Sequence, residues 1–100
     1  MKTYRGMRLE NGVALVEIID HENGHITYRS SRNEDHPEFD WGYNGMGPYH
    51  LAQFLIQDAM PFQDIPQHAL LALDHVIAHW ADGWTVTSDD IARIVIDPAP

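Results

Sequence analysis

The most unusual segment of this chain is Phe39-Asp40-Trp41-Gly42-Tyr43-Asn44-Gly45-Met46-Gly47-Pro48. It combines three large aromatic side chains with three glycines, and an apolar helical pattern follows at once. Glycine permits positive φ and close approach of the backbone to other groups, and proline suits the first turn of a helix. We therefore expect this segment, called the motif loop below, to be a shaped corner that leads into a helix. The loop residues of interest are Trp41, Gly42, Tyr43, Asn44, Gly45, Gly47 and Pro48.

The segment upstream of the motif loop has the pattern of an antiparallel meander. Asn11-Gly12 and Asn23-Gly24 each separate strand-like runs. Asn-Gly favours a type I′ hairpin turn, which needs positive φ at both central residues. The middle run is apolar at nearly every position, which favours a central strand covered at least partly on both faces. The expected strands are Thr3–Leu9, Val13–Asp20 and His25–Arg29.

The segment downstream of the loop is predicted to be helical. Apolar residues at helical spacing indicate a first helix from Pro48 to Met60, which Pro61 ends. A second helix is expected from Pro66 or Gln67 to Ala81, with Gly83 as its C-cap. Its apolar stripe, which should face the core, is Leu70, Leu73, Val76, Ile77 and Trp80.

A short extended stretch over residues 84–86 precedes a last helix near residues 88–96. Thr87 or Ser88 would cap that helix, and Asp89 and Asp90 lie in its first turn, where negative charge is favourable.

The chain length suits one small domain with a single core. We expect residues 1–30 to form the meander, residues 31–47 the connection with the motif loop, and residues 48–96 the helical part. The predicted fold is α+β: a three-stranded antiparallel β-meander followed by two or three helices packed on one face.

Charge is distributed unevenly along the chain. Residues 1–32 carry five basic and four acidic residues, whereas residues 33–100 carry only Arg93 against eleven acidic residues. Such a field attracts basic protein surfaces and repels nucleic acid, so direct binding of DNA or RNA is not expected. The alternative is that the acidic residues only keep a small domain in solution.

Composition also indicates the cell compartment in which the protein is expected. The chain has no cysteine, which excludes disulfides and thiolate metal sites. It has no apolar run near the roughly 20 residues that span a membrane, and its N-terminus lacks an apolar signal core. We therefore expect a cytoplasmic protein without membrane contact and without a cofactor.

The motif loop followed by Leu51-Ala52 resembles a family of short proteins of unknown function from bacteriophages, prophages and other mobile elements. Those proteins share a motif of the form F-(D/E/N)-W-G-Y-G-G-S-G-P-x-x-L-A. Their opening Tyr-x-Gly strand is matched by Tyr4-Arg5-Gly6, and their W-x-(L/V)-T stretch by Trp84-Thr85-Val86-Thr87. Asn44 and Met46 depart from the motif; asparagine tolerates the left-handed region, so the turn can survive. The resemblance implies a phage or mobile-element origin and no particular reaction.

The first candidate site is an acidic face on the helical half. Clustered carboxylates could offer spaced negative charge to a basic groove, in imitation of a nucleic-acid backbone. A generally acidic surface is the alternative interpretation. The residues of this candidate face are Asp58, Asp64, Asp74, Asp82, Asp89 and Asp90.

The second candidate is an anion site at the motif loop. Free N–H groups and the helix dipole favour a phosphate or nucleotide at a helix N-terminus, and Trp41 and Tyr43 could stack on a base. No lysine or arginine lies between Arg32 and Arg93, so the cation would come from the meander. The alternative is that the aromatic residues belong to the core and the glycines allow a close crossing of the sheet.

A third candidate is the pair His75 and His79, which are i, i+4 neighbours that could share a divalent metal. No glutamate follows His75, as it would in a catalytic zinc motif, so a solvated face is the simpler interpretation and no metal is expected. Hydrolytic motifs are also lacking, and we do not expect an enzyme.

The leading hypothesis is a non-catalytic phage or mobile-element protein that binds and inhibits a host protein or complex in the host cytoplasm. A defence system such as a CRISPR effector complex, with a basic surface, is the expected kind of partner. One alternative is a small protein that sequesters a nucleotide or anion at the motif loop. Another is a structural phage protein that acts by self-association. The oligomeric state is left open.

Overall fold

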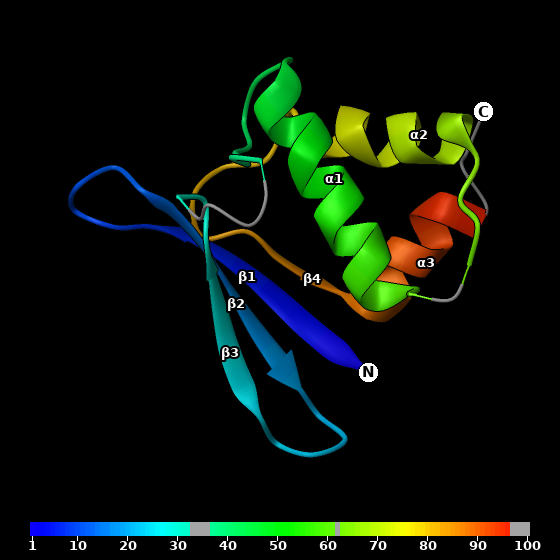
Figure 1. Cartoon of the computed structure of the whole chain (residues 1–100), viewed down its shortest axis with the longest axis horizontal. Coiled ribbons are helices and arrows are strands. Elements are labelled where there is room, and N and C mark those ends of the chain that lie inside the picture. Colours follow the sequence, from blue (N-terminus) through cyan, green and yellow to red (C-terminus); the bar gives the residue numbers. More distant parts are fainter. Residues whose placement is uncertain (33–36, 62, 97–100) are drawn as a thin grey trace.

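The described part of the chain forms one antiparallel sheet and three helices. The computed structural model describes residues 1–32, 37–61 and 63–96. Figure 1 shows the helices gathered on one side of the sheet. The predicted α+β class is confirmed. In chain order the elements are β1 Lys2–Arg8, β2 Ala14–Asp20, β3 Ile26–Ser30, α1 Met46–Ala59, α2 Gln67–Ile77, β4 Thr85–Thr87 and α3 Ser88–Ile96.

Two hairpins join the first three strands at the predicted places, but their turns are not of the predicted type. In these two turns only the glycines, Gly12 and Gly24, have positive φ, at 86° and 74°. Asn11 Oδ1 accepts the Val13 N–H at 3.0 Å, and Asn23 makes the equivalent bond in the second turn at 2.9 Å. The type I′ prediction was therefore wrong. The asparagine side chain closes each turn on the backbone, and glycine alone supplies the left-handed residue.

The sheet has four strands, not the three predicted. β4 pairs antiparallel with β1, where Tyr4 faces Val86, and the strand order becomes β3-β2-β1-β4. The extended character of residues 84–86 was predicted, but a segment this short has no alternation that could reveal a partner. β2 is an interior strand, as expected, and β4 makes β1 a second one.

α1 begins at Met46, with Gly45 as its N-cap, two residues before the predicted start at Pro48. Pro48 thus lies within the first turn, where its missing N–H costs nothing. The helix ends at Ala59, one residue before the predicted Met60.

α2 ends at Ile77, four residues before the predicted Ala81, and Gly83 is not its C-cap. The Ile77 carbonyl accepts the Trp80 N–H at 3.0 Å and the Gly42 N–H at 3.1 Å. In a continued helix this carbonyl would accept the Ala81 N–H instead. The motif loop therefore donates a hydrogen bond to the carbonyl that the next helical turn would have used.

One apolar core lies between the sheet and the helices. Of the stripe predicted on the second helix, Leu73 and Ile77 are fully buried, whereas Leu70, Val76 and Trp80 are only half-buried. The stripe is divided because α2 packs against α1 and α3. Among the described residues, no helix is long and apolar enough to cross a membrane. The largest fully buried side chains include Tyr4, Val16, Leu51, Leu55, Leu73, Ile77 and Ile91.

The sheet face away from the helices carries a polar line across three strands. Arg5 Nη2 lies 3.2 Å from Glu17 Oε1, and the Tyr28 hydroxyl donates to Glu17 Oε2 at 3.2 Å. Glu17 is only 8% exposed although it belongs to the apolar middle run. On the face of β2 away from the helices, Arg5 and Tyr28 of the neighbouring strands thus shield the Glu17 carboxylate from solvent.

Asp58 joins β1 to the last turns of α1. Lys2 Nζ lies 3.2 Å from Asp58 Oδ2, and the Tyr4 hydroxyl donates to the same oxygen at 2.7 Å. Tyr4 is fully buried. Its burial and then its hydrogen bond to Asp58 raise the pKa of the Tyr4 phenol above the ordinary value.

We expect the protein to lose stability above about pH 10, the ordinary pKa of tyrosine. The folded state holds the Tyr4 proton more tightly than the unfolded chain. The stabilisation is therefore complete below the unfolded pKa and falls as pH rises, by about 1.4 kcal/mol per pH unit. Tyr4→Phe should flatten this alkaline loss. Urea unfolding of both proteins across this pH range measures the difference, and equal alkaline slopes would contradict the expectation.

Candidate functional site

The motif loop is held at several points along its length. The Asp40 N–H donates to the Gly47 carbonyl at 3.1 Å, and the Gly42 N–H donates to the carbonyl that ends α2. Phe39 and Trp41 are buried, at 4% and 3% exposed. The loop is therefore a packed corner between the sheet and the helices, and its first two aromatic side chains belong to the core.

Two loop glycines lie where no side chain fits. Gly42 has φ of 87°, and a Cβ there would lie 2.9 Å from the Trp80 carbonyl oxygen. A Cβ on Gly47 would overlap the Tyr43 hydroxyl. By contrast, Asn44 does not have positive φ, so the expected left-handed asparagine does not occur. Close packing therefore explains why Gly42 and Gly47 of the motif loop are glycines.

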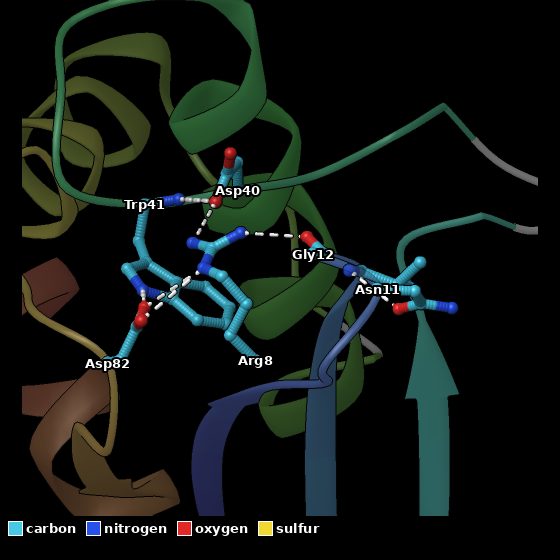
Figure 2. Close-up of polar contacts among 7 residues, drawn as sticks. Arg8, Asn11, Gly12, Asp40, Trp41 and Asp82 are labelled. Atoms are coloured by element: carbon cyan, nitrogen blue, oxygen red, sulfur yellow. Dashed lines mark hydrogen bonds and ion pairs between the residues drawn. The ribbon is translucent and has the colours of Figure 1, made fainter.

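Arg8 lies at the centre of a polar cluster between β1, the motif loop and the turn before β4, as Figure 2 shows. Its Nη2 lies 2.8 Å from Asp40 Oδ1 and its Nε 3.2 Å from Asp82 Oδ1. Its Nη1 donates to the Gly12 carbonyl at 3.2 Å. The Trp41 indole N–H donates to Asp82 Oδ1 at 2.8 Å, and the Arg8 guanidinium lies 5.0 Å from the centre of the Trp41 ring. We call these four side chains the Arg8 clamp.

The clamp joins chain segments rather than presenting reactive groups. Its hydrogen bond to Asp40 raises the pKa of the Arg8 guanidinium, which is charged at any ordinary pH in any case. Both carboxylates share one cation, which also stacks on an aromatic ring, so the cluster keeps one net negative charge. The arrangement fixes the corner, and partial solvent exposure limits what each ion pair adds to stability.

Trp41 of the clamp belongs to a cluster of three tryptophans. The Trp84 ring meets Trp41 edge-on with centroids 5.5 Å apart and lies 4.4 Å from the Trp80 ring. The Trp84 indole also covers Gly6, whose missing side chain leaves room for it. The Tyr4-Arg5-Gly6 strand and the Trp84 stretch, which are far apart in sequence, thus meet in space.

The six aspartates of the predicted acidic face do not share one environment. Asp58 is bound by Lys2 and Tyr4, and Asp82 belongs to the Arg8 clamp. Asp90 accepts the Thr87 N–H at 3.0 Å, which caps α3 and holds the pKa of Asp90 below its usual value. Half of the set is therefore engaged inside the molecule.

The other three aspartates make no ion pair with a described residue. Asp64 and Asp89 are exposed, and Asp74 is half-buried on α2. Burial raises the pKa of the Asp74 carboxyl from its ordinary value. These are the aspartates of the predicted face that remain available to a partner.

His75 and His79 are exposed, and their rings lie 5.3 Å apart. His79 follows the end of α2 instead of lying on it. In the described part of the chain, no group of three or more histidine, cysteine, aspartate or glutamate side chains could hold a metal ion. The pair therefore lacks the further ligands that a protein metal site uses.

A hollow of about 380 Å³ opens where the loop enters α1. Arg8, Arg32 and His50 line it together with Tyr43 and the first turn of the helix. Gly45, the N-cap, supplies no capping side chain. The carboxylates of Glu38 and Asp40 line the same hollow, so the site is mixed in charge.

Arg8 is the site residue that sequence reasoning missed. A signal was present, because the loop and the turn at Asp82 are acidic while the chain has no basic residue between Arg32 and Arg93. A partly exposed acidic corner without a basic residue of its own takes its cation from the meander. The sequence did not show which of the meander's basic residues would serve.

Comparison with known proteins places the chain in a family. No curated protein and no solved structure matches it. A family model described as a family of unknown function matches residues 4–97, from β1 past the end of α3 and across the whole motif loop. Membership in an uncharacterised family was predicted and is confirmed, while the phage origin and the motif stay predictions. The chain belongs to the family of unknown function DUF6166.

Proposed function

We propose that this protein acts without catalysis, by binding a basic surface of a host protein or complex and thereby inhibiting it. The observation that carries the proposal is the set of aspartates, Asp64, Asp74 and Asp89, that no described basic side chain neutralises. They belong to the segment after residue 32, which has a single arginine against eleven acidic residues. A field of one sign steers a partner of the opposite sign and selects against like charge.

The resemblance of the motif loop to phage and mobile-element proteins supports a bacterial defence complex as the partner. Such complexes hold nucleic acid in basic grooves. An acidic protein that fills a groove of this kind competes with the nucleic acid. The inhibition would then weaken with salt, as nucleic-acid binding does.

Asp58, Asp82 and Asp90 make hydrogen bonds within the protein, so the test uses the other aspartates. Changing Asp82 would loosen the Arg8 clamp, so a loss of binding there would report damage to the fold. Asp64→Lys with Asp89→Lys reverses two exposed charges that make no ion pair with a described residue, and circular dichroism checks that α3, whose first turn contains Asp89, is kept. Glu10→Lys with Glu22→Lys makes the same change in net charge at exposed residues of the two hairpin turns.

We expect tagged wild-type protein to capture a basic nuclease or nucleic-acid-binding protein from cells of its host. With that purified partner, the Asp64 and Asp89 double variant should bind about tenfold more weakly or worse, as for the loss of close charge pairs. The Glu10 and Glu22 double variant should bind almost as wild type. Capture of no such protein, or equal losses in both variants, would contradict the proposal.

A second candidate is capture of a small anion or nucleotide in the hollow at the start of α1. Arg8, Arg32, His50 and the helix N-terminus favour it, while Glu38 and Asp40 oppose it. Equilibrium dialysis with a panel of nucleotides and inorganic phosphate tests this function. Binding that Arg32→Ala abolishes would favour it, and no binding across the panel would exclude it.

A further inference from the structure

β3 is an edge strand with one side of its backbone unused. It follows β2 in the sheet, and no described strand lies beyond it. The His25 carbonyl and the Ser31 N–H, which flank the strand, both bond to β2. Bonded residues alternate in an antiparallel ladder, so Thr27 and Arg29 also face β2. The backbone N–H and C=O groups that point to the free edge belong to Ile26, Tyr28 and Ser30.

A groove of about 430 Å³ lies between β3 and α1. Its apolar part contains Phe39 and Phe54, whose rings stack with centroids 5.9 Å apart. One face of α1 forms its wall, from His50 to Asp58. At about 1.5 Å per residue this wall is about 12 Å long, which matches about four residues of extended chain. In Figure 1, α1 runs in the same general direction as the strands.

Arg29 lies between the free edge and the groove. Its guanidinium is 5.6 Å from the centre of the Phe54 ring, and it makes no ion pair with a described residue. The side chain is exposed on the sheet face that the helices occupy. A strand added at the edge would bring alternate side chains past this cation and toward Phe54.

We propose that the β3 edge and the β3–α1 groove bind an extended acidic peptide segment of another protein by strand addition. Backbone bonds to the free edge give the affinity, and the groove selects the side chains. An aromatic or large apolar side chain enters beside Phe54, and a carboxylate two residues away bonds to Arg29. This site is separate from the acidic aspartates of the proposed function.

Charge favours such a peptide over a second copy of the chain. In a β3–β3 pair each edge strand would bring Arg29 as its one charged residue, so neither copy would offer a carboxylate to the other's Arg29. An acidic segment instead meets Arg29 directly.

The probe is the labelled heptapeptide acetyl-Thr-Glu-Thr-Phe-Thr-Glu-Thr-amide. Its sequence reads the same in both directions, so it presents one phenylalanine and two glutamates on one face in either strand orientation. We expect fluorescence anisotropy to show binding with Kd below about 1 mM. In amide NMR spectra, the N–H signals of Ile26, Tyr28 and Ser30 should shift on binding, while those of the buried Val16 and Ile18 stay in place.

Two controls separate strand addition from general charge attraction. Arg29→Glu should weaken binding about tenfold or more, as for the loss of a charge-assisted hydrogen bond. It should also reverse the preference toward a peptide with lysine in place of glutamate. Arg32→Glu makes the same charge change beyond the end of β3, at a residue that does not line this groove, and should have a much smaller effect. A peptide with N-methyl groups on alternate residues should not bind, because it lacks the ladder donors.

Several results would overturn the proposal. The first is no binding of the heptapeptide at about 1 mM. The second is an equal loss of peptide affinity in Arg29→Glu and Arg32→Glu. The third is binding of the N-methylated peptide as strong as that of the unmethylated one. Light scattering that shows a dimer, with the Ile26 and Tyr28 amides protected from exchange without peptide, would assign the edge to a second copy instead. The Asp64 and Asp89 variant should bind the heptapeptide as wild type does, so failure of either proposal can be told from failure of the other.

Discussion

Gly6→Ala should destabilise the protein by about 3 kcal/mol or more, although it replaces glycine with a better strand former. The cause is the Trp84 indole, which lies where the new methyl group would be, with Cζ2 2.6 Å from the Cβ position. Trp84 is itself held by Trp41, Trp80 and its own backbone, since its carbonyl accepts the Gly6 N–H at 2.9 Å. Neither partner can move away cheaply. Urea unfolding followed by circular dichroism measures the change.

Gly24→Ala is the matched control for this substitution. Gly24 has φ of 74° and nothing near its Cβ position, so alanine there costs only the left-handed strain, about 1 kcal/mol. Adding Trp84→Leu to Gly6→Ala should cost less than the sum of the two single changes, because the smaller side chain relieves the overlap. Strict additivity, or equal costs at Gly6 and Gly24, would show that the overlap does not matter.

Trp41→Ala should cost about 4 kcal/mol, as for other large aromatic residues removed from a core. Trp41 is buried, meets Trp84 edge-on and donates its indole N–H to Asp82. Its removal also leaves Arg8 without the ring beneath it. Since small domains have a total stability of roughly 5–15 kcal/mol, a large fall in thermal midpoint is expected.

Two variants divide this cost into its parts. Trp41→Phe keeps an aromatic ring and loses the bond to Asp82, so it should cost about 1–2 kcal/mol. Tyr43→Ala removes an aromatic side chain from the same loop that is 46% exposed, and its cost should stay near that of a surface change, about 0.5 kcal/mol. Equal losses at Trp41 and Tyr43 would contradict the view that the loop is a packed corner.

The elements were predicted well where the signals are local. Asn-Gly pairs, apolar spacing and Pro61 located three strands and three helices to within a few residues, apart from the C-terminal end of α2. That end was missed because the Gly42 N–H, from another part of the chain, takes the Ile77 carbonyl. The turn type was missed because an asparagine side chain can close a turn without adopting positive φ itself.

The candidate site was predicted only in outline. The glycines of the motif loop indicated close approach, but not that Gly42 approaches the Trp80 carbonyl or that Gly6 accommodates Trp84. The aspartates were read as one face, and the structure engages Asp58, Asp82 and Asp90 internally. A one-dimensional pattern shows that a carboxylate is present, and only its neighbours in space show whether it is neutralised.

The sequence by itself determined the kinds of elements, their order and the packed corner at residues 39–48, because turn chemistry and apolar spacing act over a few neighbouring residues. The tertiary structure alone decided the pairing of β4 with β1, the end of α2 and the Arg8 clamp. Arg8 and Asp82 are 74 residues apart. Contacts over such a separation depend on how whole elements pack, and no local propensity encodes that arrangement.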